Sequence, residues 1–159
     1  MVIKQKRRII YIVAAVVLLA PVLLLAVRSA MAKRPDNLGV HDGRLADCPK
    51  SPNCVCTQCT DTQHQIAPIP FEGPAPEAIQ RIKAALATIP RIKVITQTPD
   101  YIHAEATSLL FRFVDDVEFF MDTNAKLIHF RSASRTGYSD LGVNRSRMEK
   151  IRQAFQAGS

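Results

Sequence analysis

The sequence predicts an α+β domain, in which a four-stranded antiparallel sheet carries helices on one face, behind an N-terminal transmembrane helix. Three patterns support this prediction. An uncharged apolar run near the N-terminus has the length of a membrane span, two later segments have the helical period, and four segments between them alternate apolar and polar residues. An order of helix, four strands and helix favours an antiparallel sheet with its helices on one side.

The membrane helix is predicted at residues 9–27, "IIYIVAAVVLLAPVLLLAV", which hold no charge. At 1.5 Å per residue this run spans about 28 Å, close to the hydrocarbon thickness of a bilayer. We expect residues 1–8 to form a basic cytoplasmic tail and the C-terminal part to lie on the periplasmic side of an inner membrane. A secretory signal cleaved after Ala32, in "SAMA", is the alternative, and the protein would then be secreted.

The charge distribution argues against nucleic acid as a partner. The chain of 159 residues has a net charge of +7, yet seven of its 21 basic residues precede Pro35 and no acid precedes Asp36. The remaining 14 basic residues balance 14 acids. A neutral domain lacks the broad positive field that non-specific nucleic-acid binding requires. The expected partner of the N-terminal segment is the lipid bilayer.

All four cysteines fall in one short stretch, "CPKSPNCVCTQC", at Cys48, Cys54, Cys56 and Cys59. On the exported side of a membrane, an even number of cysteines in an irregular loop favours two structural disulfides, in any of three connectivities. Zinc held by three thiolates and His64 or His41, and redox chemistry at the Cys56-x-x-Cys59 motif, are weaker alternatives because the spacing of known sites is missing. We predict neither a metal nor a cofactor. A linker is expected at residues 28–47, before a globular domain at residues 48–157.

The domain opens with a helix and a hairpin. Apolar residues recur at helical spacing over residues 78–89, and Pro90 ends the helix. The segments Arg91–Thr98 and Tyr101–Ser108 alternate as strands around the turn "TPDY". The second strand should bury Ile102, Ala104 and Ala106 and turn outward Tyr101, His103 and Glu105.

The third strand is predicted in "FRFVDDVEFF", and the break between it and the preceding strand is bracketed at Thr107 to Arg112. The core row consists of the odd positions Leu109, Phe111, Phe113, Asp115, Val117 and Phe119, whereas the even positions Arg112, Asp116 and Glu118 should face outward. The fourth strand, "KLIHFRSA", must set Ile128 and Phe130 against that core row. A two-residue loop places Glu118 opposite His129, and a four-residue loop places Glu118 opposite Arg131.

The last helix is expected to start at an Asn144 cap and to bury Met148, Ile151 and Phe155. Six acids and one base lie between Asp100 and Asp122, and six bases and two acids lie between Arg131 and Arg152. These blocks should pair. Asp115 needs a partner most, because an isolated charge in an apolar row costs several kcal/mol. Arg135 and Arg145 are the candidates.

Two interpretations of the arginine-rich segment follow. In the structural one, the acids, chiefly Asp115, Asp116 and Glu118, pin residues 134–144 onto the sheet. In the functional one, a small anion is surrounded by Arg131, Arg135, Tyr138, Asn144 and Arg145, with help from loop amides and the start of the last helix. Sequence templates of common hydrolases, nucleotide-binding proteins and metalloproteases are missing.

The motifs "CPKSPNCV", "FRFVDDVEF" and "RSASRTGYSDLGVNRSRMEKIR" resemble those of the domain of unknown function family 1499, from about Cys48 to Phe155. The resemblance implies a small, often membrane-associated protein without an assigned activity. Cys48 and Cys54 match the family pattern, and Cys56 and Cys59 look like additions that form a disulfide of their own.

Together these patterns predict a non-catalytic, membrane-tethered envelope domain that binds a small anionic ligand or a protein partner. One alternative is a hydrolase or transferase acting on a lipid or cell-envelope component, with Asp115 or Asp140 as general acid or base. Another is a thiol or metal protein that uses the cysteine loop.

Overall fold

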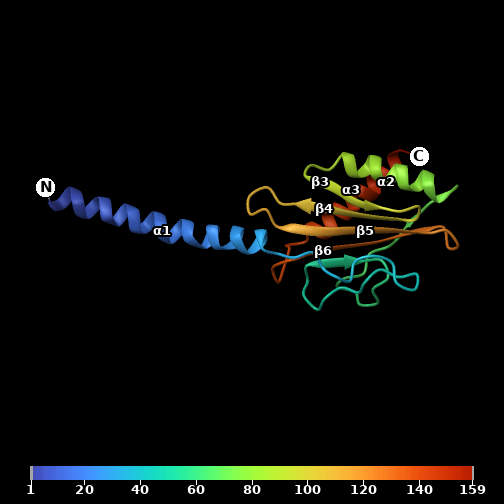
Figure 1. Ribbon diagram of the computed structural model, residues 1–159, viewed down its shortest axis with the longest axis horizontal. Helices are drawn as coiled ribbons and strands as arrows, with labels where there is room; N and C mark the ends of the chain where they lie inside the picture. The colour runs from blue at the N-terminus through green and yellow to red at the C-terminus, as the bar shows by residue number, and fades with distance from the viewer. Residues whose placement is uncertain (1, 159) are drawn as a thin grey trace.

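The computed structural model describes residues 2–158, and Figure 1 shows a long helix, α1 (Val2–Ala30), extending away from an α+β domain. Helices α2 (Ala75–Ala87) and α3 (Val143–Ala157) lie on one face of a single antiparallel sheet. The predicted fold class and helices are therefore confirmed. Within the described residues, the segment Lys4–Ser29 is long and apolar enough to cross a bilayer.

The sheet has six strands where the sequence predicted four. The strands are β1 (Cys54–Cys56), β2 (Ile69–Pro70), β3 (Ile92–Gln97), β4 (Tyr101–Thr107), β5 (Val114–Asp122) and β6 (Leu127–Ser134). They are ordered β1-β6-β5-β4-β3, and β2 also pairs with β6. The two additional strands come from the cysteine loop and the segment after it. Strands of three and two residues are too short to show a period of two.

The hydrophobic core lies between the sheet and the two helices. From the sheet, Ile102, Val117 and Phe130 are fully buried, and α2 and α3 contribute Ile82 and Ile151. The alternation of β4 to β6 and the helical stripes therefore meet on one side, as the sequence indicated. Phe119 and Phe130 are direct cross-strand partners with ring centroids 6.2 Å apart, an arrangement that adds to the stability of the pairing.

The β5–β6 turn uses four residues. Asp122 Oδ1 accepts hydrogen bonds from the backbone amides of Asn124 and Ala125, which closes the turn. Glu118 then lies opposite Arg131. Of the two registers left open by the sequence, the four-residue loop is the one adopted.

The break between the second and third predicted strands lies close to the predicted bracket, but the assignment of Leu109, Phe111 and Phe113 to the core row of the third strand is wrong. Residues 108–113 form a loop, closed by Ser108 and Phe113, which exchange two hydrogen bonds. The side chains of Leu109 and Leu110 are each 73% exposed, so Leu109 does not belong to a core row. The apolar residues of this loop continue the alternation of β5, and the pattern alone does not separate them from the strand.

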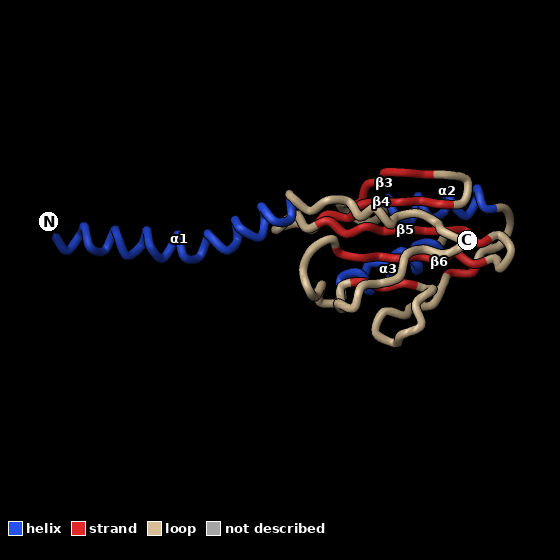
Figure 2. The backbone as a smooth tube through the Cα atoms, turned by 60° about the horizontal axis from the view of Figure 1, so that its bottom comes forward, coloured by secondary structure: helices blue, strands red, loops and turns tan. Residues whose placement is uncertain are grey.

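The second face of the sheet is also buried, which overturns the prediction of an outward row. Tyr101, His103, Asp116 and Glu118 are all buried there. Figure 2 shows irregular chain passing over this face, opposite α2 and α3, and we refer to residues 34–60 as the covering segment. Alternation shows which side chains share a face. It does not show whether a chain without periodicity covers that face.

The cysteines stabilise the covering segment. Cys48 is bonded to Cys54 and Cys56 to Cys59, with Cα–Cα distances of 5.7 and 5.4 Å. Cys54 and Cys56 belong to β1 at the sheet edge. The first bridge thus ties the irregular chain that precedes β1 to the sheet.

Replacing both Cys48 and Cys54 by Ala should lower the free energy of unfolding by about 2 kcal/mol, because the unfolded chain loses a covalent constraint on a short loop. Urea denaturation of the full chain in detergent, followed by tyrosine fluorescence, measures this change. Thiol labelling of the purified full chain without reductant is the companion measurement. Four reactive thiols, or an unchanged unfolding midpoint in the double variant, would contradict the disulfide assignment.

Candidate functional site

A layer of buried charge lies between the sheet and the covering segment. At its centre, Glu118 on β5 is completely buried. Its carboxylate accepts hydrogen bonds from Arg131 Nη1 at 3.2 Å, from the Tyr101 hydroxyl at 2.8 Å and from the backbone amide of Gly39 at 2.8 Å. Gly39 adopts φ of 108°, a conformation that side chains disfavour. Burial, together with the charge of Glu118, raises the pKa of Tyr101, so this residue remains a hydrogen-bond donor.

Asp116 forms the second centre of this layer. Arg135 binds it through two parallel hydrogen bonds, Nε to Oδ2 at 2.8 Å and Nη2 to Oδ1 at 2.6 Å, and His103 Nε2 lies 2.8 Å from Oδ1. Burial alone would raise the pKa of Asp116, but the hydrogen bonds and charges of Arg135 and His103 outweigh it, and the pKa is lowered. The hydrogen bond to Asp116 in turn raises the pKa of Arg135.

The same guanidinium connects Asp116 to the neighbouring strand and to the covering segment. Arg135 Nη2 lies 2.5 Å from Glu105 Oε1, which Arg34 also binds at 2.7 Å. Burial raises the pKa of Glu105, but the two arginines outweigh this effect and lower it. Arg34 is the first residue of the covering segment, so the chain that follows α1 is fixed by charge to β4.

A separate ionic cluster lies on the helix side of the sheet. Asp115 is paired with Arg147 of α3 at 2.5 Å, so the prediction of Arg135 or Arg145 as its partner is wrong. The reason is geometric. Side chains alternate along β5, so Asp115 faces α3, whereas Asp116 faces the covering segment and takes Arg135.

Asn144 is part of this second cluster and does not cap α3. Its side chain is fully buried and bonds to Ser132, Arg147 and the Asn53 carbonyl. The helix begins one residue earlier, and the Asp140 carboxylate accepts the backbone amides of Gly142 and Asn144 at 3.0 and 2.7 Å. The capping role predicted for Asn144 therefore belongs to Asp140.

The residues predicted to surround an anion lie in several places. Arg131 and Arg135 are buried among acids, Asn144 is on the opposite side of the sheet, and Arg145 donates to the carbonyls of Gln63 and Gln65 at 3.0 Å. Tyr138, in the β6–α3 loop, is 77% exposed. Of this set, Arg135 and Tyr138 line a common pocket.

This pocket has a volume of about 710 Å³ and lies where α1 meets the domain. Its walls are Leu25, Arg28 and Met31 from the end of α1 and the residue after it, and Phe113, Arg135, Thr136, Gly137 and Tyr138 from two loops. The lining includes two arginines and no acid. Thr136 Oγ1 is buried without a hydrogen-bond partner among the residues that the structure describes, which is rare for a buried hydroxyl.

Arg28 and Thr136 were missed by the sequence analysis. Arg28 was counted among the flanking charges of the membrane span, and its position directly after an apolar run was the available signal. Only the folded chain brings it beside a loop more than a hundred residues later.

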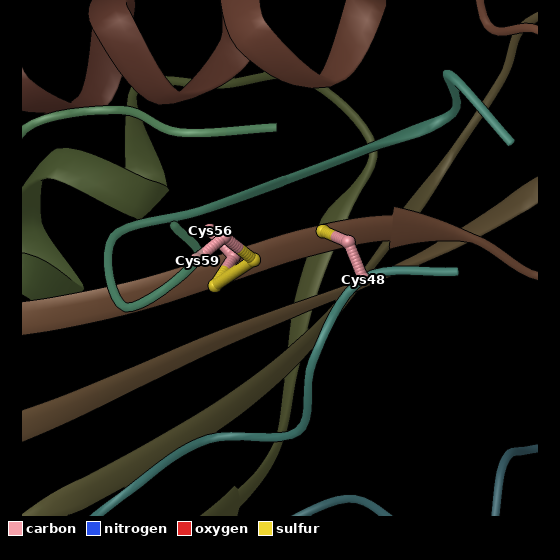
Figure 3. A group of neighbouring side chains, drawn as sticks. All are labelled: Cys48, Cys56 and Cys59. Atoms are coloured by element: carbon pink, nitrogen blue, oxygen red, sulfur yellow. A yellow bond between two sulfur atoms is a disulfide. The ribbon is translucent and has the colours of Figure 1, made fainter. Parts of the chain in front are cut away.

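Among residues 2–158, two groups of side chains have metal-ligand character. Ligand atoms of His103, Glu105 and Asp116 lie within 4.8 Å of one another. The guanidinium of Arg135 bonds to both carboxylates and occupies the position that a cation would take. The sulfurs of Cys48, Cys56 and Cys59 also cluster (Figure 3), but each belongs to a disulfide and none is a thiolate.

Comparison with known families places this geometry in context. Residues 44–155 match the family model described as "Protein of unknown function (DUF1499)", and the chain belongs to that family. No curated protein matches the chain.

Asp116→Asn should lower the free energy of unfolding by about 3–5 kcal/mol, because it leaves the guanidinium of Arg135 buried without its main partner. The pKa of Asp116 is lowered in the folded state, so its contribution is complete above the ordinary value of 3.8 and is lost as the pH falls through the folded-state value. The difference between wild type and variant should therefore shrink in acid.

Chemical denaturation of the full chain in detergent between pH 7 and pH 3 measures this difference. The matched control is Asp47→Asn, which removes an exposed carboxylate 3.8 Å from Arg44 and should change stability by less than about 0.5 kcal/mol. An Asp116→Asn variant as stable as this control at pH 7 would refute the ionic role of Asp116.

Proposed function

We propose that the chain is a single-pass, membrane-anchored domain on the exported side, which binds a small anionic ligand without catalysing a reaction. The ligand site is the pocket at the end of α1. The observation that carries the proposal is a pocket lined by Arg28 and Arg135, with no acid in its walls. Phosphate, sulfate and carboxylate groups are the chemistry that such a site recognises.

The availability of hydrogen-bond donors supports this site. Arg135 uses Nε and Nη2 for Asp116 and Glu105, and among the described residues no hydrogen bond engages its Nη1. Its guanidinium is held rigidly by the buried carboxylates, so an anion meets a donor already in position. Arg28 adds a positive charge that no acid among the described residues pairs with.

The contacts at the end of α1 favour a retained anchor over a cleaved signal. Ser29 is buried, and its hydroxyl donates to the carbonyl of Arg112 at 2.7 Å. Cleavage after Ala32 would remove this contact, together with Leu25, Arg28 and Met31 from the pocket. The basic residues before the apolar run, Lys4, Lys6, Arg7 and Arg8, favour a cytoplasmic N-terminus.

The state of the two candidate catalytic acids favours binding over catalysis. Asp115 is paired with Arg147, and both oxygens of Asp140 accept backbone amides. The carboxylate of Asp115 holds β5 to α3, and that of Asp140 holds the start of α3 to its loop. Protonation of either carboxylate would weaken these contacts. Neither acid lines the pocket at the end of α1.

Anion binding should raise the melting temperature of the full chain in zwitterionic detergent at low salt. An anion at ten times its dissociation constant adds about 1.4 kcal/mol, or roughly 5 °C for a domain of this size. Inorganic phosphate, sulfate and acetate test free anions, and a water-soluble short-chain phosphatidic acid tests a lipid phosphate.

Arg28→Gln should abolish the shift, and Lys150→Gln is the matched control, because Lys150 is an exposed cation on the helix side of the sheet. A shift with the short-chain lipid and not with inorganic phosphate would identify a headgroup as the ligand. No shift with any of these compounds would contradict the proposed function.

A further inference from the structure

We propose that the α1-proximal end of the domain docks on the bilayer, with two loops in contact with lipid. These loops, residues 108–113 and 135–142, are named here the anchor-side loops. The inference rests on the membrane anchor of the proposed function and is independent of the anion pocket. The domain would then contact the membrane at three points: through α1 and through each of the two anchor-side loops.

The distribution of exposed apolar side chains is the first observation. Beyond α1, all of the exposed large apolar residues among those described lie in the anchor-side loops or directly beside them: Met31, Leu109, Leu110, Tyr138, Leu141 and Val143. Leu141 is 95% exposed and Tyr138 77%. Isolated exposed leucines are common on proteins, but their confinement to one end of a domain indicates an interaction surface.

The topology sets both loops beside the membrane helix. The 108–113 loop joins the end of β4 to the start of β5, and the 135–142 loop joins the end of β6 to α3. Both loops therefore lie at the same end of the antiparallel sheet. Figure 1 shows that α1 leaves the domain from this end, and the β3–β4 and β5–β6 turns lie at the opposite end.

Contacts with α1 set the depth of the loops. Leu25, which belongs to the uncharged run, lines the same pocket as Phe113 and Tyr138. Ser29 is hydrogen-bonded to the carbonyl of Arg112. The loops therefore lie beside the last two turns of the span, at the level where a bilayer passes from hydrocarbon to headgroups.

The chemistry of the surface fits this level. Arg28, Lys33 and Arg112 are exposed beside the leucines and suit lipid phosphates. The acid in these loops is Asp140, whose carboxylate is turned to the amides at the start of α3. A tyrosine beside leucines and arginines is the composition of an interfacial segment.

The backbone of the second loop presents its leucine and does not bury it. Leu141 has φ of 55°, an unusual value for leucine, and its amide bonds to the hydroxyl of Ser139. A strained residue that contacts little of its own protein gains no packing energy from the fold. Insertion into lipid would give the side chain of Leu141 the apolar surroundings that the fold does not provide.

The chain contains no tryptophan, so single tryptophans report on each position. Four full-length variants are required: Leu110→Trp and Leu141→Trp in the anchor-side loops, Leu18→Trp inside α1, and Asn124→Trp in the β5–β6 turn at the opposite end of the sheet. Each is reconstituted into phosphatidylcholine vesicles with ordinary or brominated acyl chains. The substituted loop positions are highly exposed, so the fold should be unaffected.

Brominated lipid should quench Leu18→Trp strongly, leave Asn124→Trp unchanged, and reduce the emission of both Leu110→Trp and Leu141→Trp by about half, as expected for side chains just below the headgroups. Both loop positions behaving like Asn124→Trp, with Leu18→Trp quenched, would overturn docking and leave the anchor intact. Quenching at one loop alone would overturn the two-loop arrangement.

Two further outcomes also refute the inference. Blue-shifted but unquenched emission from the loop positions would mean that a second copy of the chain covers them. An unquenched Leu18→Trp would remove the anchor and, with it, the surface on which the loops would rest.

Discussion

The structure depends on the burial of carboxylates on the face of the sheet opposite α2 and α3. Asp116 and Glu118 lie under the covering segment, where an unpaired charge would cost several kcal/mol. Arg135 and Arg131 neutralise them, and both come from β6 or the loop that follows it. The position of this loop is therefore fixed by electrostatics more than by apolar packing. Because Arg135 also lines the pocket beside α1, the buried ion pairs and the proposed ligand site share one side chain.

The two faces of the sheet divide the structural tasks. The helix side carries the apolar core and one ionic cluster, in which Asn144 and Arg147 tie α3 to β5 and β6. On the opposite side, the covering segment forms hydrogen bonds with side chains of the sheet, and two disulfides constrain its conformation. In this largely irregular segment, covalent and ionic links supplement the burial of apolar residues such as Leu45 and Val55. Those links lead directly to the end of α1, through the contact of Arg34 with Glu105.

Periodicity predicted the helices, the hairpin, the inner row of β4 and the choice of two registers for β5 and β6, because each depends on neighbours in sequence. Periodicity did not predict which residues pair with the acids. Asp115 meets Arg147 and Glu118 meets Gly39, pairs that only the packed chain defines. Leu109, Phe111 and Phe113 were assigned to the core row of a strand, since an apolar row in the sequence does not show what covers it. The pocket was missed because one of its walls, at Arg28, belongs to α1, which is distant in sequence from the loops that form the other walls.

Docking and ligand binding support each other in physical terms. In the proposed arrangement, the end of α1 is held to the domain by Ser29 and Arg34, and loops that touch the bilayer beside it would restrict tilting of the domain relative to the membrane. The pocket then stays at the level of the headgroups, since Leu25 of the span forms part of its wall. Lipid phosphates confined to that plane have a high effective concentration, so a site with modest intrinsic affinity remains occupied. A free anion has no such advantage. Taken together, the two proposals favour a lipid headgroup over a soluble ion as the occupant of the arginine-lined pocket.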